Sequence, residues 1–470
     1  MKNQKQNKFV TISISIALII NIAWSFYNLN KFDNIKVNFE GEYYNQLLYS
    51  DLGPTWIIAD RFKKKLDNGE SFFSSIPAYE RFLLPSILVG YYYHIIDKEI
   101  FENKNENKKV IKEKNFKIFL LLFQILIYYS SVLLISNEIF KRFDHQKSKL
   151  IILFLCLEPS LLQWHSSFWS ESIFLSLMIL AFFILLKKSE KAFFNILLGF
   201  IVGLMFMQRS VSFLYILPIC IYFFLVFKQR FKPLSFLLIG YFFVTALIGY
   251  NNLIKTGSVY FVPTHMTYYG YYHYFAHQIL ADRKNISYPE ASEILKNNEM
   301  DWRKENNINI NNTEDLLKNI KYRNKVFAKE IIQNPLYSTQ LFIKRSVKTS
   351  IIMPLWVNKK YYFDKTDPEA QNNPKEYYNK NLIYNIPYTL FIYLFFAIGF
   401  FNLFKKIFIN KIKDPIDNFY IFNLISILYF LFIVGFWGNP KYFTPCMISI
   451  SFFFAEGFFV IRKKYFKSQN

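Results

Sequence analysis

Long runs of apolar residues separated by short charged segments dominate the chain. A helix that crosses the hydrocarbon core of a bilayer needs about 20 predominantly apolar residues. Because uninterrupted runs of this length are what a hydrocarbon core selects, the pattern predicts an all-α polytopic membrane protein with about ten transmembrane helices. The expected spans are residues 9–27, 118–139, 150–168, 170–186, 193–208, 211–227, 233–252, 385–404, 418–437 and 443–461.

One apolar run, residues 82–96, is too short to be assigned by length. If it does not cross, the basic clusters that follow the later spans share the side of Lys2, Lys5 and Lys8. If it crosses, every later cluster moves to the opposite side, against the bias of Lys and Arg toward one membrane face. We therefore predict a juxtamembrane or re-entrant helix here.

This topology divides the chain into three parts. Residues 1–252 form a transmembrane core whose first outer loop is 28–117, residues 253–384 form a large mixed outer loop, and residues 385–470 hold the last spans and a tail. The first run has no small-residue cleavage site, so we expect a retained signal anchor. Both termini are expected in the cytoplasm, and the Lys, Asn, Ile and Phe bias suggests a bacterial inner membrane.

Composition narrows the class further. The 470 residues include 55 Phe and 34 Tyr, and this aromatic excess points to lipid. A disordered, a collagen-like or a disulfide-stapled protein is excluded, and the three cysteines stand singly in apolar runs. The formal charge of +22 comes from short clusters between apolar runs rather than from a basic face, so no nucleic-acid partner is expected.

The first outer loop carries one set of candidate residues. Asp51 precedes an amphipathic stretch, and Arg81 stands just before the short apolar run. A carboxylate at the membrane face can deprotonate an acceptor hydroxyl, while Arg61 and Arg81 can neutralise a phosphate leaving group. An ordinary solvated loop explains the same residues, and this alternative stays open.

The segment LEPSLLQWHSSFWSESIF carries a second set. Glu158, His165 and Glu171 interrupt an otherwise apolar hairpin, and ionisable groups at membrane depth usually line a cavity, pair or bind an ion. Pro159 is expected to break the first helix of the hairpin. Glu171 could equally stand in a solvated turn with no function, and His165 could serve only to hold the structure together. Glu158 is expected to pack in the core or to cap a helix.

Two further outward turns and the start of the large loop complete the candidates. Arg209 ends one span, where phosphate recognition and interface snorkelling are both open. The last turn holds Lys441 and Tyr442. The large loop opens with His265, His273 and His277 among tyrosines, so a metal site is conceivable, while a sugar-stacking surface explains the tyrosines equally well.

Taken together, these motifs resemble the GT-C superfamily of multi-span glycosyltransferases, which contains protein O-mannosyltransferases and lipid A aminoarabinose transferases. The likeness covers most of the first 260 residues. Two departures are a Lys at position 441 in place of the usual Arg and a single acid at position 51 in place of an acidic pair. The matching positions are Asp51, Trp56, Ala59, Gly69, Arg81, Pro85, Pro159, Glu171, Lys441, Tyr442 and Pro445.

The resemblance implies an inverting glycosyltransferase, hexosyl- or pentosyl-transferring, with a polyprenyl-phosphate sugar donor and a hydroxyl acceptor on a glycan, glycolipid or protein. It makes Asp51 the base and gives Glu171 an accessory catalytic role, with or without a divalent cation. Phosphate contacts fall to Arg61, Arg81, Arg209, Lys441 and Tyr442, and sugar or acceptor contacts to Trp56, His165 and Tyr268. A transporter or flippase, and a polysaccharide polymerase using the Lys344 and Arg345 region, remain alternatives.

Overall fold

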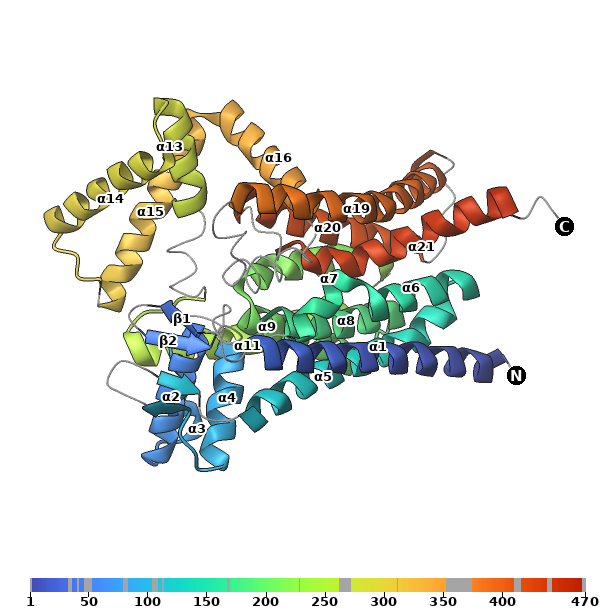
Figure 1. Cartoon of the computed structure of the whole chain (residues 1–470), viewed down its shortest axis with the longest axis horizontal. Coiled ribbons are helices and arrows are strands. Elements are labelled where there is room, and N and C mark those ends of the chain that lie inside the picture. The colour runs from blue at the N-terminus through green and yellow to red at the C-terminus, as the bar shows by residue number, and fades with distance from the viewer. Residues whose placement is uncertain are drawn as a thin grey trace.

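The computed structural model of the protein is an elongated helical bundle with two smaller units at one end (Figure 1). Both chain termini lie at the opposite end of the bundle. We call the end with the two units the outer end and the end with the termini the inner end. The structure describes residues 2–32, 36–39, 42–45, 53–78, 83–103, 109–111, 114–166, 170–227, 229–261, 272–310, 312–351, 374–409, 416–437 and 442–466.

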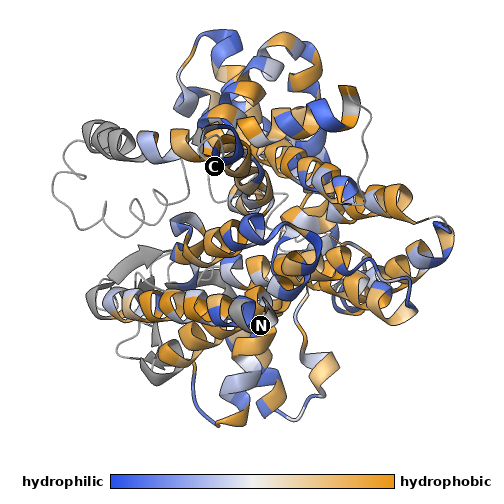
Figure 2. Ribbon diagram, turned by 90° about the vertical axis from the view of Figure 1, so that its right-hand side faces the viewer, coloured by the Kyte–Doolittle hydropathy of each residue, from blue (hydrophilic) through white to orange (hydrophobic). Residues whose placement is uncertain are grey.

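Seven helices of the described residues are long and apolar enough to cross a membrane, so the chain is a polytopic helical membrane protein. Seen from the inner end, their ribbons are mainly hydrophobic (Figure 2). They are α1 (Lys2–Phe32), α5 (Lys114–Arg142), α8 (Ser170–Lys187), α11 (Phe231–Thr256), α19 (Pro374–Phe404), α20 (Asp417–Trp437) and α21 (Thr444–Phe466).

Of the ten expected spans, seven are long apolar helices in the described part of the chain, and the other three predicted runs form shorter segments. Two become shorter apolar segments, α9 (Ala192–Gln208) and η2 (Ser210–Tyr215) with α10 (Ile216–Val226). The third breaks before Pro159 into α6 (His145–Leu157), α7 (Pro159–Leu162) and η1 (Gln163–Ser166). At the break the Glu158 carboxylate accepts from the Leu161 backbone N–H at 3.0 Å and from the Tyr388 hydroxyl at 2.8 Å. The expectation that Glu158 caps a helix is confirmed.

The first outer unit contains the short run that was ambiguous in the sequence. That run forms α4 (Leu83–Ile95), which lies across the ends of the long helices instead of beside them (Figure 1). It packs on α2 (Gly53–Asp67), close to α3 (Phe72–Ser75). Two small antiparallel hairpins complete the unit: β1 (Lys36–Phe39) with β2 (Glu42–Asn45), and β3 (Phe101–Asn103) with β4 (Lys109–Ile111).

The second outer unit is helical. It consists of η3 (Tyr272–Ala276), α13 (His277–Lys284), α14 (Tyr288–Glu305), α15 (Thr313–Gln333) and α16 (Pro335–Ile351). Glu299 of α14 and Arg323 of α15 form a buried pair with two hydrogen bonds, of 2.7 and 2.8 Å. Arg303 and Asn319 also bond the Glu299 carboxylate, so one buried acid joins the two helices.

The basic segments between the spans meet at the inner end. The Arg142 guanidinium donates to the Lys187 carbonyl at 3.2 Å, and Lys147 pairs with Glu456 at 2.5 Å. Lys149 lies over the Phe9 ring near the N-terminus. These contacts join segments that the sequence placed on one side, so the placement of α4 as a helix that does not cross agrees with the structure. η4 (Lys405–Ile409) follows α19 at the same end, where Lys406 pairs with Asp417.

Candidate functional site

The candidate site lies at the outer end, where the hairpin of α8 and α9 places the start of one helix beside the end of the other. Glu171 is in the first turn of α8, and Arg209 is the residue that ends α9. A helix carries partial positive charge at its N-terminus and partial negative charge at its C-terminus. Each side chain therefore has the charge that its helix end favours, and the antiparallel packing brings the two together.

Glu171 and Arg209 form a buried ion pair. Nη1 of Arg209 lies 2.6 Å from Oε1 of Glu171, and the two side chains are 2% and 1% exposed. The guanidinium carbon is 4.8 Å from the centroid of the Tyr442 ring and 5.8 Å from that of Phe174. Of the residues proposed from the sequence, the structure thus brings Glu171, Arg209 and Tyr442 into one cluster, which we call the outer cluster.

Polar neighbours hold the outer cluster in place. The Ser170 hydroxyl donates to Oε2 of Glu171 at 3.3 Å, and the Gln208 side-chain amide donates to the Ser170 carbonyl at 2.9 Å. Gln208 is fully buried and was not among the predicted site residues. Its position beside Arg209, at the end of an apolar run, was the available signal, because a buried amide at membrane depth needs a specific partner.

His165 is buried beside the outer cluster. Its Nδ1 lies 2.7 Å from the hydroxyl oxygen of Ser172, the residue after Glu171, and its ring is 4.0 Å from the Tyr128 ring. The neighbouring Trp164 indole N–H donates to the Thr444 hydroxyl at 3.2 Å, which ties η1 to the start of α21. These contacts fix the turn between α7 and α8, so His165 has a structural role whatever else it binds.

The first outer unit reaches the same end of α9 through apolar packing. Leu83 at the start of α4 clusters with Phe206 of α9 and with Val244 of α11. Asn251 of α11 donates to the Pro77 carbonyl at 2.8 Å. These contacts fasten the first outer unit to α11 and to α9, the helix that ends at Arg209.

The candidates of the first outer loop have separate outcomes. Trp56 is buried in α2, whereas Arg61 is exposed on the same helix. Asp51 and Arg81 lie outside the described residues, so their proposed roles stay predictions.

Titratable groups also connect α2 with α4. Asp67 accepts from Lys63 on its own helix, and its Oδ1 lies 2.7 Å from Nδ1 of His94 on α4. Burial alone would raise the pKa of the Asp67 carboxyl, but the hydrogen bonds from His94 and Lys63 outweigh it and lower that pKa below its ordinary value. The ionised carboxylate therefore stabilises the contact between the two helices.

The remaining candidates lie mainly outside the described part of the chain. Lys441, His265 and Tyr268 are among the residues that the structure does not describe, as is the side chain of His273. His277 is buried in the second outer unit. No group of three His, Cys, Asp or Glu residues suited to a metal ion occurs among the described residues. A metal role for these histidines stays a prediction.

The basic pair considered for a polymerase can be placed as well. Lys344 is exposed on α16. The Arg345 guanidinium donates to the Phe436 carbonyl at 3.1 Å and lies over the Phe275 ring. Arg345 therefore joins α16 to the outer end of α20, which is a structural role.

Comparison with known proteins gives distant structural matches. No protein-family model and no curated protein sequence matches the chain. It is similar to the archaeal oligosaccharyltransferase AglB from Archaeoglobus fulgidus in complex with an inhibitory peptide and a dolichol-phosphate, at 12% identity over 97% of this chain and 50% of that one, with a TM-score of 0.48. The apo form of the Archaeoglobus fulgidus oligosaccharyltransferase gives 12% identity over 98% and 51% of the two chains and a TM-score of 0.48. This chain thus spans about half the length of these proteins. The likeness is weak, and the proposal below rests on this chain's own side chains.

Proposed function

We propose that the chain is a membrane glycosyltransferase of the GT-C type that moves a monosaccharide from a polyprenyl-phosphate donor to a hydroxyl acceptor. The observation that carries the proposal is the buried cluster of Glu171, Arg209 and Tyr442 at the outer end. A buried guanidinium is costly to maintain in a membrane protein and usually serves an anionic ligand or an ion path. Here it stands at the outer end of α9, the end that carries the two outer units, which favours a surface reaction over a path through the bilayer.

In the proposed reaction the donor phosphate binds at Arg209. A guanidinium has five N–H donors in a planar fork, so pairing with Glu171 leaves others for the oxygens of a phosphate. Glu171 holds the guanidinium in place, and the Tyr442 ring covers it. The charge that develops on the departing phosphate is then met by a donor already in position, which requires little reorganisation during the reaction.

Asp51 is the proposed general base. Its carboxylate takes the proton of the acceptor hydroxyl as the hydroxyl oxygen attacks the anomeric carbon of the donor sugar. The bond from that carbon to the phosphate oxygen breaks, and the polyprenyl phosphate leaves with the bonding electrons. This single displacement inverts the anomeric configuration. Arg61, Arg81 and Lys441 are further candidates for the phosphate, and Trp56, His165 and Tyr268 for the sugar or acceptor.

The proposed orientation follows the charge distribution. The basic segments gather at the inner end, and such segments favour the cytoplasmic side of a membrane. We therefore assign both termini to the cytoplasm and the reaction to the extracytoplasmic face of a bacterial inner membrane. Any divalent cation would be held by carboxylates near the outer cluster, and the proposed displacement works without one.

The test compares cells that express the native chain, the Asp51→Asn variant or the Arg209→Met variant, by mass spectrometry of surface glycolipids, polysaccharide and glycoproteins. We expect both variants to lose one defined sugar residue and to accumulate the truncated acceptor, at unchanged protein level for Asp51→Asn and after normalisation to the amount of folded protein for Arg209→Met. Lys344→Met is the matched control, because Lys344 is exposed and far along the chain from the outer cluster. Shortened chains built of complete repeat units would instead identify a polymerase. Unchanged glycans in both variants would remove the proposed reaction and favour transport.

A further inference from the structure

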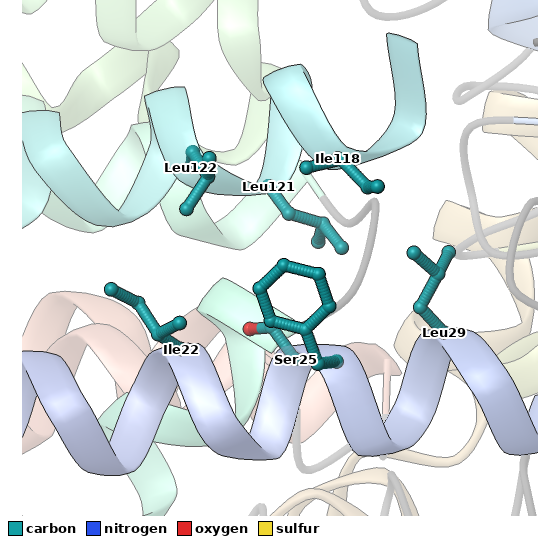
Figure 3. Close-up of a pocket in the computed structure, with 7 residues that line it drawn as sticks. Ile22, Ser25, Leu29, Ile118, Leu121 and Leu122 are labelled. Atoms are coloured by element: carbon teal, nitrogen blue, oxygen red, sulfur yellow. The ribbon is translucent and has the colours of Figure 1, made fainter. Parts of the chain in front are cut away.

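A groove opens between α1 and α5 on the lipid-facing side of the bundle. The space that it leaves for water-sized molecules is about 10 Å³, so it is a shallow surface groove and not a cavity. Figure 3 shows α1 side chains on one side of it and α5 side chains on the other. Its walls are almost entirely apolar and contain no Lys or Arg. The lining residues are Ile22, Ser25, Phe26, Leu29, Ile118, Leu121 and Leu122.

The groove lies at the level where the outer membrane surface is expected. Trp24 and Tyr27 of α1 are stacked with ring centroids 5.4 Å apart, and they are 44% and 46% exposed. Exposed Trp and Tyr at the end of a span mark the boundary between hydrocarbon and headgroups. A lipid of the outer leaflet would therefore present its headgroup region to this part of α1.

The protein side of the groove carries unusual polar groups. Asn21 and Ser25 are one helical turn apart on α1 and are 1% and 3% exposed. The Asn21 amide donates to the Tyr129 hydroxyl at 2.7 Å, but its Oδ1 and the Ser25 hydroxyl have no hydrogen-bond partner in the described structure. Leaving such groups unpaired away from water is costly, so they point to a ligand that can both donate and accept.

Side-chain contacts link this place to the outer cluster. The Tyr129 ring packs against Tyr128 at 5.3 Å, and Tyr128 packs against His165 at 4.0 Å. His165 is bonded to Ser172, the neighbour of Glu171, and its buried Nε2 also has no partner in the described structure. Buried polar atoms without a partner in the described structure, on Ser25, Asn21 and His165, therefore lie between the groove and the proposed reaction centre.

We propose that the groove between α1 and α5 binds the acceptor and that this acceptor is a membrane glycolipid. Its acyl chain would lie against the apolar walls, while its sugar hydroxyls would bond Ser25, Asn21 and His165. A hydroxyl both donates and accepts, as these unpaired atoms require, whereas a phosphate headgroup only accepts when ionised and would find no cation among the groove's lining residues. The proposal rests on the proposed glycosyl transfer and chooses among its acceptor classes.

Photocrosslinking of the full-length protein in vesicles tests it. Benzoylphenylalanine is placed at Leu122 in the groove or at Ile20, which is exposed to lipid on another part of α1. The radiolabelled probes are monoglucosyl diacylglycerol, undecaprenyl phosphate and phosphatidylcholine, whose headgroup has no hydrogen-bond donor. At Leu122 we expect the glucosyl lipid to label at least about fivefold more than the other two, the ratio that one hydrogen bond supplies. At Ile20 we expect no preference.

A serine pair provides the control for recognition. Ser25→Ala should lower labelling by the glucosyl lipid about fivefold and leave phosphatidylcholine labelling unchanged, while Ser13→Ala, at another buried serine of α1, should change neither. Equal labelling by all three lipids, or no effect of Ser25→Ala, would overturn the proposal. Preference for undecaprenyl phosphate would assign the groove to the donor and overturn it too. Crosslinking needs no turnover, so selective labelling in a protein that transfers no sugar would reject the reaction but not the groove.

Discussion

Removal of the Arg209 charge tests the reasoning about the outer cluster most directly. In Arg209→Met the Glu171 carboxylate stays buried at 1% exposure without its counter-ion. With charge centres about 4 Å apart and an effective dielectric constant of about 20, the native pair attracts by about 4 kcal/mol. Breaking a buried pair on one side typically costs about 3–5 kcal/mol, so we expect a loss of that size in the free energy of unfolding.

A double-mutant cycle separates the pair from its surroundings. We would measure the free energy of unfolding in micelles for Arg209→Met, Glu171→Gln and the combined variant. Because the second change removes the stranded charge, the combined variant should be more stable than the sum of the single effects predicts, by about 2–3 kcal/mol. The exposed Lys141 pairs with Glu138 near the inner end, and Lys141→Met should cost less than about 1 kcal/mol.

Arg209→Lys distinguishes the functional role from the structural one. It keeps the positive charge but loses the planar fork, so stability should largely return while sugar transfer stays low. Single-variant losses that simply add would refute the coupling between Arg209 and Glu171. Full activity of Arg209→Lys would refute a forked contact with phosphate.

Three further predictions concern other parts of the molecule. Gly199→Leu should sharply reduce the yield of folded protein in detergent, because a Cβ at Gly199 would stand 1.9 Å from a backbone carbonyl oxygen of α11. Asp67→Asn should lower the melting temperature at neutral pH. His94 and Lys63 lower the pKa of Asp67 in the folded protein, so its stabilising contribution is present above the unfolded pKa of about 3.9 and is lost as the pH falls through the folded pKa. The melting temperatures of the variant and the native protein, plotted against pH, should therefore converge between about pH 5 and pH 2. Arg323→Met removes the more buried of the two guanidinium partners of Glu299 and leaves Arg303 and Asn319, so it should make the second outer unit more sensitive to limited proteolysis while the bundle stays resistant.

The lengths of the apolar runs predicted that the chain is a polytopic helical membrane protein and where most of its spans lie, because every span must cross the same thickness of hydrocarbon. This prediction failed where local chemistry interrupts a run. Residues 150–168 read as one helix, yet Pro159 lacks the N–H that would continue it, and the Glu158 carboxylate caps the new start. The distribution of Lys and Arg between the spans predicted that α4 does not cross the membrane, which hydropathy could not decide. The described basic segments lie together at the inner end, as that prediction requires.

The candidate site was predictable only in part. Charged residues inside apolar runs pointed to Glu171 and Arg209, but their pairing depends on how two helix ends meet, which residue spacing does not specify. The groove had no signal in the sequence, because Asn21 and Ser25 read as ordinary small polar residues in a span. Their importance arises from Tyr129, which lies 108 positions further along the chain.

The broken helix also affects how the protein fits its bilayer. The 13 residues of α6 rise roughly 20 Å at about 1.5 Å per residue, less than the roughly 30 Å of a hydrocarbon core, whereas α1 and α5 have 31 and 29 residues. The break at Glu158 and Pro159 therefore lies inside the hydrocarbon core, and α7 and η1 complete the crossing up to the turn that carries His165. Such a protein senses hydrophobic mismatch. Longer acyl chains in the surrounding lipid would place the break deeper in the hydrocarbon and slow the proposed reaction with no change in sequence.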